Sequence, residues 1–429
     1  SDSKPRAFQS YQPRTHPRRG MKVAFDTFGC RLNRAESLDL EARLLQLGWE
    51  KTSSHSDADL IIVRGCSVTG RAEHDTVKFI EGLKKKYPAK RIFTLGCVKN
   101  RTPEAMLEKI LTPQRVSEND SAAEAIPLST ARAYLKVQDG CSSNCSFCIV
   151  PSFRGKSISV DFTRVLERAR RFIASGYTEI VVTGCNLSLY LSEGKRLPEL
   201  LDALAKLPSK GHRIRIGSLE PGVIARDTVS VMADNANICR FLHIPVQSAS
   251  NKILNDMRRP YRQHDIDNLV ETAVKTIPGI SLGCDIISGF PGERESDHIA
   301  TLEYLKRKDF TNVHAFPYSE RPGTPAANFA NKIAKEIRSQ RAREISLAVA
   351  SKRRDFAKSF KGSTVEVVVE KASASAGWTS EYLWCAQNGT QISTTTSFLR
   401  NLPNRPRRRQ IVRMLVKDVH GDTLYGDIV

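Results

Sequence analysis

The chain has 429 residues, of which 26% are charged and 40% hydrophobic, a composition typical of a globular protein. Its length exceeds one ordinary hydrophobic core and predicts two to four domains. No run approaches the roughly 18 consecutive apolar residues that span a bilayer, and residues 1–20 lack the apolar stretch of a secretion signal. These features argue against membrane-spanning and secreted proteins, and we expect a cytoplasmic protein with no membrane partner.

The charge is strongly positive, since 66 Lys and Arg against 46 Asp and Glu give a formal net charge of +20. Such an excess favours a polyanionic partner, because each neutralised phosphate releases counterions. A generally basic surface is the plainer alternative. Clustering favours the first interpretation: the basic residues gather in the head as Lys4, Arg6, Arg14, Arg18 and Arg19, and near the end as Arg405, Arg407, Arg408 and Arg409. An organelle transit peptide would need an amphipathic helix, which the prolines of the head interrupt.

In chain order, residues 1–20 form a basic head without predicted structure. From residue 21 onward, short apolar strands at 22–28, 60–63 and 91–95 alternate with helical stretches, which predicts an open parallel α/β sheet. Each strand ends in a Gly-Cys pair, and the pairs are spaced by about one βαβ unit of roughly 30 residues. Because parallel strands end at one edge, we expect Cys30, Cys66 and Cys97 to converge on a ligand. Three unrelated buried cysteines are the alternative.

A second α/β series begins near residue 131. Its strands are predicted at 134–138, 179–183, 213–217, 241–246, 280–288 and 312–318, which predicts a partial (β/α)6 barrel with its active site at the strand C-termini. After a charged helix at about 335–358, strands at 364–370, 410–416 and 423–429 predict a small β-barrel. The fold class is therefore α/β multidomain, with a head (1–20), an α/β domain (21–130), a partial barrel (131–360) and a terminal β-barrel (361–429).

The ten cysteines, with no export signal, indicate thiolates that bind metal rather than a disulfide framework. In Cys141-Ser-Ser-Asn-Cys145-Ser-Phe-Cys148, three thiolates on one loop can hold three corners of a cubane cluster and leave one iron open. The amino and carboxylate groups of S-adenosylmethionine (SAM) suit such an iron. A zinc knuckle is the alternative, but the second Cys or His pair that it needs does not follow.

The chain resembles the radical SAM methylthiotransferase family over residues 21–429. The matching strings are Thr27-Phe-Gly-Cys30-Arg-Leu-Asn33, Gly65-Cys-Ser-Val-Thr69, Leu95-Gly-Cys97, Cys148-Ile-Val-Pro151, Arg154-Gly-Lys156, Leu242-His-Ile-Pro-Val-Gln247, Asp285-Ile-Ile-Ser-Gly-Phe-Pro-Gly292 and Phe316-Pro-Tyr-Ser-Glu-Arg-Pro-Gly-Thr-Pro325. The last string is most similar to the MtaB type, which modifies threonylcarbamoyladenosine beside the tRNA anticodon, and less similar to the MiaB and RimO types. Two positions depart from the family pattern: Arg64-Gly65 before the second cysteine, and Gly377-Trp-Thr-Ser-Glu-Tyr382.

The resemblance implies two [4Fe–4S] clusters and SAM as cofactors. Cys30, Cys66 and Cys97 would ligate the auxiliary cluster, Cys141, Cys145 and Cys148 would ligate the SAM cluster with a catalytic role, and the TRAM-like terminal barrel would grip the substrate. A 5′-deoxyadenosyl radical from SAM would then abstract hydrogen from adenine C2, where a methylthio group is inserted. The implied partners are tRNA, an electron donor such as flavodoxin or ferredoxin, and a sulfur donor.

Other residues are weaker candidates. Phe147 is expected to pack against the adenine of SAM, and Arg154, Glu220 and Gln247 are expected to contact SAM or substrate, with core packing or structural hydrogen bonds as the alternatives. The arginine loop at 405–409 is expected to bind RNA backbone rather than bases. Cys185, Cys239, Cys284 and Cys385 match no cluster pattern and are expected to be ordinary cysteines.

Three functions remain open from the residues. The first is methylthiolation of threonylcarbamoyladenosine in tRNA, and the second is methylthiolation of isopentenyladenosine in tRNA or of a protein or peptide. The third is a non-catalytic iron–sulfur RNA-binding protein, which the open iron of the Cys141–Cys148 loop argues against. The arginines of the terminal barrel favour RNA over protein as the substrate.

Overall fold

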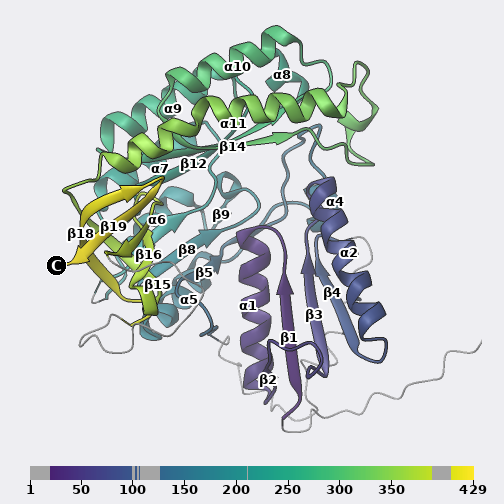
Figure 1. Ribbon diagram of the computed structural model, residues 1–429, viewed down its shortest axis with the longest axis vertical. Helices are drawn as coiled ribbons and strands as arrows, with labels where there is room; N and C mark the ends of the chain where they lie inside the picture. The colour runs from purple at the N-terminus through teal and green to yellow at the C-terminus, as the bar shows by residue number, and fades with distance from the viewer. Residues whose placement is uncertain (1–19, 99–101, 104–105, 107–125, 210, 389–406) are drawn as a thin grey trace, which may run out of the picture.

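The computed structural model describes residues 20–98, 102–103, 106, 126–209, 211–388 and 407–429. Three parts follow one another along the chain: an N-terminal α/β sheet, a central series of β/α units and a C-terminal β-barrel (Figure 1). This arrangement confirms the predicted α/β multidomain fold class. Among the described residues, no helix is both long enough and apolar enough to cross a membrane.

The N-terminal sheet is entirely parallel, with strand order β2-β1-β3-β4. Its elements are β1 (Lys22–Thr27), α1 (Arg31–Gln46), β2 (Glu50–Lys51), β3 (Leu60–Gly65), α2 (Gly70–Lys86) and β4 (Arg91–Gly96). The branched apolar run of β3 is buried on both faces: Leu60 and Ile62 pack in one cluster with Leu44 of α1, and Ile61 packs in another with Leu83 of α2. The carboxyl ends of β1, β3 and β4 therefore share one edge.

The central part is a curved sheet of six parallel strands. In spatial order these are β5 (Ala133–Lys136), β8 (Glu179–Thr183), β11 (Arg213–Ile216), β12 (Phe241–Gln247), β13 (Ser281–Ser288) and β14 (Phe310–Pro317), with β8 placed between β5 and β11. Two parallel bridges, from Ile214 to Ile238 and from Ser218 to His243, join the two halves of the sheet. The six strands form the predicted partial barrel.

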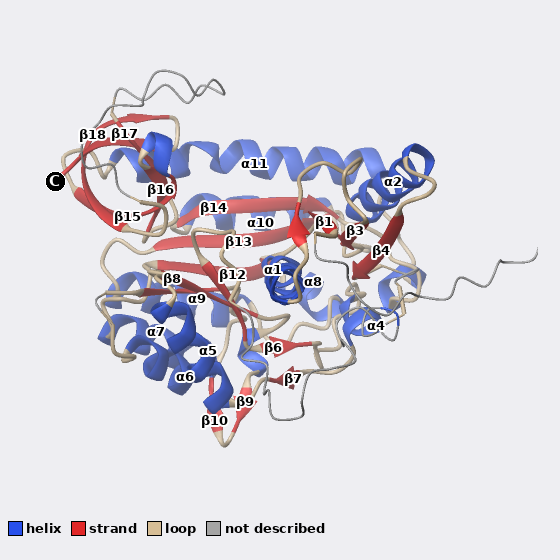
Figure 2. Ribbon diagram, turned by 90° about the horizontal axis from the view of Figure 1, so that it is seen from below, coloured by secondary structure: helices blue, strands red, loops and turns tan. Residues whose placement is uncertain are grey.

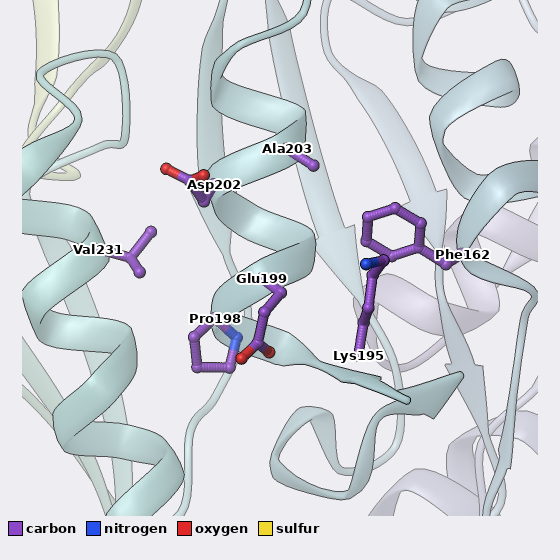
Figure 3. A pocket seen from close by; sticks show the side chains of 7 residues that line it. All are labelled: Phe162, Lys195, Pro198, Glu199, Asp202, Ala203 and Val231. Atoms are coloured by element: carbon purple, nitrogen blue, oxygen red, sulfur yellow. The ribbon is translucent and has the colours of Figure 1, made fainter. Parts of the chain in front are cut away.

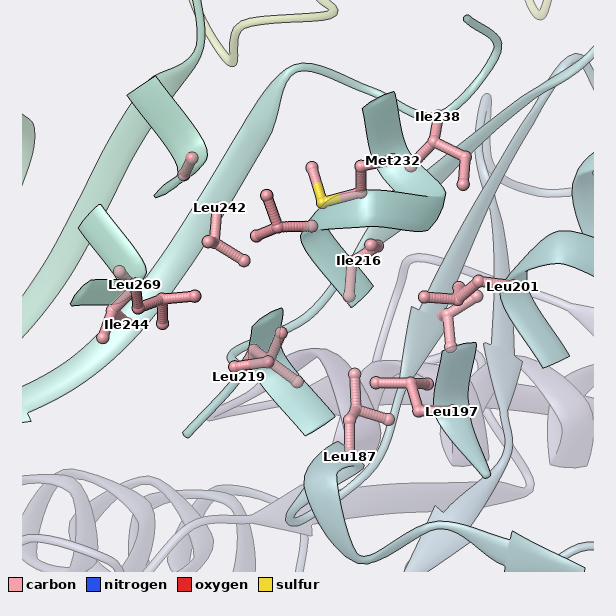
Figure 4. Close-up of a cluster of buried hydrophobic side chains, with 14 of the residues drawn as sticks. Leu187, Leu197, Leu201, Ile216, Leu219, Met232, Ile238, Leu242, Ile244 and Leu269 are labelled. Carbon is pink, nitrogen blue, oxygen red and sulfur yellow. The ribbon is translucent and has the colours of Figure 1, made fainter. Parts of the chain in front are cut away.

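Helices cover the outer face of this sheet. They are α5 (Phe162–Ala174), α6 (Leu197–Ala205), α7 (Val223–Asp234), α8 (Asn251–Asp256), α9 (Gln263–Thr276), α10 (Glu295–Arg307) and α11 (Lys335–Lys358). Side chains such as Leu201, Met232 and Leu269 from the helices meet Ile216 and Leu242 from the strands in the main core (Figure 4). Alternate residues of each strand therefore point the other way, into the inner face, which we call the lumen.

The N-terminal part covers the lumen on the β5 side. Ala35 and Leu38 of α1 pack against Tyr134 of β5 and Val181 of β8, in a small apolar cluster of their own. On the other side, α11 lies along β14 and reaches from the C-terminal barrel toward α2 (Figure 2). Because Ile345 and Val349 of α11 belong to the main core, α11 lies on the outer face, and α1 is the one of these two helices that faces the lumen.

The C-terminal part is a closed barrel with strand order β15-β16-β17-β19-β18. Its strands are β15 (Thr364–Lys371), β16 (Ala376–Thr379), β17 (Trp384–Gln387), β18 (Ile411–His420) and β19 (Thr423–Ile428). Arg213 and Arg215 of β11 share the buried Glu179 through Nε bonds of 2.6 and 2.8 Å. Their remaining nitrogens donate to backbone carbonyls of the terminal barrel, including Trp378 at 2.6 Å and Thr379 at 2.7 Å. The terminal barrel is therefore fastened to the start of β11.

Short elements surround the strand ends of the central sheet. They are β6 (Gln138–Asp139), α4 (Val150–Arg154), β7 (Ile158–Ser159), β9 (Leu191–Ser192), β10 (Lys195–Arg196) and the 3-10 turns at Leu187–Leu189, Pro325–Asn328 and Ala372–Ala374. The β6–β7 pair closes the long loop that contains Cys141, Cys145 and Cys148. That loop leaves the sheet where the first strand of the series ends.

Candidate functional site

Three cysteines from separate strand ends converge, and we call Cys30, Cys66 and Cys97 the strand-end triad. A Cβ placed on Gly29 would lie 2.7 Å from the Cβ and 3.0 Å from the Sγ of Cys66, so only glycine allows this approach. The amide of Cys97 donates to the carbonyl of Gly65 at 3.2 Å. Asn33, at the start of α1, donates to the carbonyls of Phe28 and Gly65, both at 2.9 Å. These bonds tie the three loops together.

The electrostatics of the strand-end triad reflect this proximity. Burial raises the pKa of the Cys66 thiol, and the neighbouring Cys30 and Cys97 raise it further. Cys66 and Cys97 are buried, whereas Cys30 is exposed at the start of α1. Proximity and partial exposure suit three thiols that face one ligand from three sides.

The second set is the loop triad, Cys141, Cys145 and Cys148. Its loop starts at Gly140, where φ is +64° and an added Cβ would lie 1.9 Å from the carbonyl oxygen of Lys156. The amide of Cys141 donates to the carbonyl of Gly155 at 3.0 Å, and that of Cys148 donates to Cys145 at 3.2 Å. Burial raises the pKa of the Cys148 thiol to about 11, with the two other thiols of the triad adding to the effect.

The donor chemistry of each triad fits a [4Fe–4S] cluster with one iron left to another ligand. In both triads a buried arginine donates to one sulfur: Arg259 Nη1 lies 2.9 Å from Cys145 Sγ, and Arg154 Nε lies 3.1 Å from Cys97 Sγ. A guanidinium stabilises a negatively charged sulfur much more than a neutral thiol, so these contacts are expected where the thiolates of an anionic cluster stand. Deprotonation of such thiols accompanies metal binding.

Arg154 joins the two triads. It ends α4, the helix that follows the loop triad, and its side chain is only 8% exposed. Besides Cys97, its guanidinium donates to Asn33 at 2.7 Å and to both Glu36 and Asp139 at 2.9 Å. Nε, Nη1 and Nη2 all bond to protein groups, which fits the structural alternative for Arg154, and its contact with SAM or substrate stays a prediction.

Two further cations belong to this network. Lys136 of β5 donates to Glu36 at 2.7 Å and to Asp139 at 2.5 Å. Arg64, one of the two departures from the family pattern, donates to Glu36 at 2.8 Å. Burial alone would raise the pKa of Asp139, but Lys136 and Arg154 outweigh it and lower that pKa to about 2. Arg64 thus adds a third cation to Glu36 without displacing a cysteine.

Glu220 lies beside the loop triad, in the loop that follows β11. It accepts from Asn186 Nδ2 at 2.9 Å and pairs with Arg259. Asn186 also donates to Ser143, within the loop of the triad, at 3.3 Å. Asn186 and Arg259 were not predicted. The position of Asn186 directly after a strand end was a usable signal, whereas Arg259 lies in a loop whose sequence has no recognisable pattern.

The remaining predicted cofactor contacts lie near the same edge. Gln247 ends β12 with a positive φ of +65° and is 8% exposed. Phe147 is partly buried and packs against the apolar cluster that contains Met257 and Phe290. This position fits core packing, and the contact of Phe147 with the adenine of SAM stays a prediction. Cys185 follows β8, and its Sγ lies 3.6 Å from Asp139 Oδ1.

The arginine loop of the terminal barrel divides into different environments. Arg405 lies outside the described residues, as do the basic residues of the head, and Arg407 and Arg408 are exposed. Arg409 instead stacks over the ring of Tyr177 at 4.1 Å and donates to the carbonyl of Ser175 in the central part at 3.3 Å and to that of Thr130 at 3.0 Å. The prediction that all four arginines are free for RNA is therefore corrected for Arg409, which anchors the barrel.

A pocket of about 460 Å³ lies elsewhere, between β10, α6 and the neighbouring helices on the outer side of the central part (Figure 3). Phe162, Lys195, Glu199 and Val231 line it. None of the ten cysteines lines it.

Comparison with known proteins matches both halves of this site. The model of the Radical SAM superfamily matches residues 135–305, and that of Uncharacterized protein family UPF0004 matches residues 22–116. A solved structure of the radical S-adenosylmethionine methyltransferase TsrM from Kitasatospora setae, with cobalamin and a [4Fe-4S] cluster bound, has a TM-score of 0.52 at 12% identity. It covers 72% of this chain and 77% of TsrM, and shows likeness of fold alone.

Relatives match more than four fifths of the chain. The threonylcarbamoyladenosine tRNA methylthiotransferase MtaB of Bacillus subtilis (strain 168) is 28% identical, covering 86% of this chain and 91% of its own. The MtaB of Aquifex aeolicus (strain VF5) is 30% identical, covering 81% and 93%. The tRNA-2-methylthio-N(6)-dimethylallyladenosine synthase of Chlorobium phaeovibrioides (strain DSM 265 / 1930) is 32% identical, covering 83% and 87%. The radical SAM match implies SAM and a [4Fe–4S] cluster, and the chain belongs to the radical SAM methylthiotransferase family of enzymes.

Proposed function

We propose that this enzyme inserts a methylthio group at C2 of threonylcarbamoyladenosine next to the tRNA anticodon. One observation carries the proposal: two cysteine triads at the strand ends of adjoining sheets are held together by Arg154, in a chain whose relatives are named tRNA methylthiotransferases. A radical source and a sulfur source at neighbouring sites are what methylthiolation of an unreactive carbon requires.

The loop triad is proposed to hold the cluster that binds SAM, and the strand-end triad a second [4Fe–4S] cluster. When bound, these groups supply reductive cleavage of SAM and the sulfur that is inserted. The chain's own residues orient and enclose them. Asn186, Glu220 and Arg259 brace the loop triad, while α1 covers the lumen and limits the entry of water. The proposed domains are 21–130, 131–360 and 361–429.

The character of the lumen favours threonylcarbamoyladenosine over isopentenyladenosine. The threonylcarbamoyl group has a carboxylate and a hydroxyl, whereas the isopentenyl group is apolar. The strand residues that face the lumen are largely polar or charged, because their apolar neighbours face the helices, and those able to donate a hydrogen bond to a carboxylate include Lys136, His243 and His314. A polar lumen compensates the loss of hydration of a carboxylate, which an apolar one does not.

The test is nucleoside mass spectrometry of tRNA from a host that lacks its own methylthiotransferases and expresses this chain. We expect 2-methylthio-threonylcarbamoyladenosine with the wild type, and none when Cys141, Cys145 and Cys148 are all changed to Ala. Accumulation of only 2-methylthio-isopentenyladenosine would show that the substrate is isopentenyladenosine in tRNA instead. Unmodified tRNA together with a methylthiolated peptide would overturn the proposal of a tRNA substrate.

The exposed arginines of the terminal barrel are proposed to bind tRNA phosphates, and an electron donor of the flavodoxin or ferredoxin type and a sulfur donor are further proposed partners. Changing Arg407 and Arg408 to Gln should weaken tRNA binding and reduce the slope of log affinity against log salt by about one to two, since two phosphate contacts are lost. Changing the exposed Lys84 and Lys85 of α2 to Gln removes the same charge elsewhere and serves as the control. An equal loss of tRNA affinity in both variants would indicate that tRNA is attracted by the overall positive charge and not by Arg407 and Arg408 in particular.

A further inference from the structure

A ligand set distinct from the cysteines faces the lumen from three adjacent strands. It consists of His243 of β12, Asp285 of β13 and His314 of β14, and its ligand atoms all lie within 4.8 Å of one another. His243 Nε2 lies 3.0 Å from Asp285 Oδ2, and His314 Nδ1 lies 3.3 Å from Asp285 Oδ1. The two imidazole rings are 5.5 Å apart and inclined by 36°. Two imidazoles thus flank one carboxylate.

The register of the sheet preorganises this set. Asp285 and His314 are direct partners in the β13–β14 ladder, so their side chains leave the sheet side by side. His243 is paired with Gly283, and a Cβ on that glycine would lie 2.6 Å from His243 Nδ1. The missing side chain leaves room for the imidazole to extend over β13 toward Asp285. Side chains held by strands in a rigid sheet suit a metal site better than side chains on loops.

Ordinary packing does not account for this group. The neighbours of the three residues on their strands, such as Leu242 and Cys284, point into the helical core. The three side chains are instead 10%, 29% and 48% exposed on the other face. Among the described residues, Asp285 has no ion pair with Lys or Arg and is paired only with the two histidines.

Other histidine–carboxylate pairs in the described residues differ from this group. His55 with Asp26 and His298 with Glu344 each join a single imidazole to a carboxylate. One imidazole is enough to satisfy a surface carboxylate by a hydrogen bond. Two imidazoles and one carboxylate, aimed at a common point from three strands, form the donor set that binds divalent transition metals.

We propose that His243, Asp285 and His314 bind one divalent transition-metal ion, Zn²⁺ or Fe²⁺, in addition to the iron–sulfur sites. Imidazole nitrogen suits both ions, and three protein ligands leave at least one coordination position open. That position faces the lumen, so it would be filled by water or by an oxygen of a molecule bound there. The ion would be held by side chains of β12, β13 and β14 on the lumen side of the sheet.

The test measures metal binding by the full chain without a polyhistidine tag, after anaerobic cluster reconstitution. Titration with Co²⁺, followed by the visible d–d absorption and by mass-spectrometric metal analysis after desalting, should give about one Co²⁺ per chain beyond the clusters. Asp285→Asn and His314→Ala should each weaken that binding at least tenfold, because each removes a ligand. Zn²⁺ should compete with Co²⁺ for the site.

The matched control is His55→Ala, which breaks a pair of one imidazole with one carboxylate and should leave Co²⁺ binding unchanged. Iron content and circular dichroism verify that each variant folds, and His314 is exposed enough for its substitution to be tolerated if Asp285→Asn is not. The proposal is overturned if the wild type takes up no more Co²⁺ than the Asp285 and His314 variants. Because no tRNA is present, this outcome would leave the proposed methylthiolation untouched.

Discussion

The two cysteine triads differ in how the chain assembles them. The loop triad lies on one loop, closed by the Cys141–Gly155 hydrogen bond and by the β6–β7 pair. The strand-end triad takes one cysteine from each of three strands and needs the whole N-terminal sheet for its geometry. A local segment specifies the first, whereas only a folded sheet specifies the second.

The dependence between the triads runs in one direction. The arginine that donates to the strand-end triad, Arg154, comes from the helix that follows the loop triad. The arginine that donates to the loop triad, Arg259, comes from the central part itself. The strand-end triad therefore relies on the central part for its charge balance, while the described contacts of the loop triad come from within the central part.

The largest effect should come from removing each triad in turn. We expect about eight iron atoms in the anaerobically reconstituted wild type, two cubanes' worth. Changing Cys141, Cys145 and Cys148 together to Ala should halve the iron and abolish SAM cleavage. Changing Cys30, Cys66 and Cys97 together should also halve the iron but spare SAM cleavage while methylthiolation stops. Iron analysis and chromatography of 5′-deoxyadenosine measure both.

The control for the triple variants is Cys239→Ser with Cys385→Ala, two buried cysteines outside both triads. Their substitution should leave the iron content unchanged. Full iron content in the strand-end triple variant would contradict the assignment of a second cluster there. Loss of SAM cleavage in that variant would contradict the independence of the loop triad.

Glycine substitutions should have a smaller effect than the triple cysteine variants, and they test whether each triad depends on its own loop or on the folded sheet. Gly140→Ala should cost about 3 kcal/mol of stability or more and lower the iron content to about half, because both a positive φ and a backbone clash at 1.9 Å oppose the added Cβ. Gly155→Ala, in the same loop, meets nothing within 4 Å, so only the backbone strain of φ +72° with ψ −162° opposes it, at about 1–3 kcal/mol. Denaturant unfolding and iron analysis distinguish them.

The same contrast exists at the strand-end triad. Gly96 has φ +85° and an added Cβ would lie 2.7 Å from the carbonyl oxygen of Gly65, whereas Gly48 has φ +88° and open space. Gly96→Ala should therefore lose the strand-end cluster and keep SAM cleavage, and Gly48→Ala should keep both. If Gly96→Ala also lost SAM cleavage, the two triads would be coupled more closely than their contacts indicate.

The smallest effect should come from Arg154→Lys, which keeps the positive charge but replaces the planar guanidinium and its several N–H donors with a single ammonium group. One ammonium cannot serve Cys97, Asn33, Glu36 and Asp139 together. We expect methylthiolation to fall about tenfold while iron content and SAM cleavage without tRNA are retained. The reduction potential of the strand-end cluster, measured by electron paramagnetic resonance, should also shift. Arg170→Lys on the exposed face of α5 is the control, and a matching fall in SAM cleavage would instead assign Arg154 to the loop triad.

Regular elements were largely predictable from hydrophobic periodicity. The predicted strand at 179–183 and helix at 335–358 have the bounds observed for β8 and α11, because both have strong patterns of their own. Spacing and position at strand ends likewise predicted which six cysteines gather in two triads, and their role as cluster ligands stays a prediction. The loop triad needed only its spacing, while the strand-end triad also needed the rule that parallel strands end at one edge.

Arginine roles were not predictable in this way, because a guanidinium has the same sequence signature in solvent, in an ion pair or against a sulfur. Arg409 belongs to a basic run that indicates RNA binding, yet its side chain stacks on Tyr177. Arg154 follows the loop triad, and its position left a contact with SAM or substrate and a structural hydrogen bond equally open. Its observed partners come from α1 and β6 as well as Cys97.

The sequence by itself determined the strand and helix order, the parallel sheets and the cysteine spacing, because these depend on local propensity and on alternation along the chain. Tertiary structure alone decided which cations meet the cysteines and which side chains share the lumen. His243, Asp285 and His314 are far apart in the chain and carry no common motif, and only the register of β12, β13 and β14 brings them together. Contacts of that kind depend on the pairing of whole strands, which no segment encodes alone.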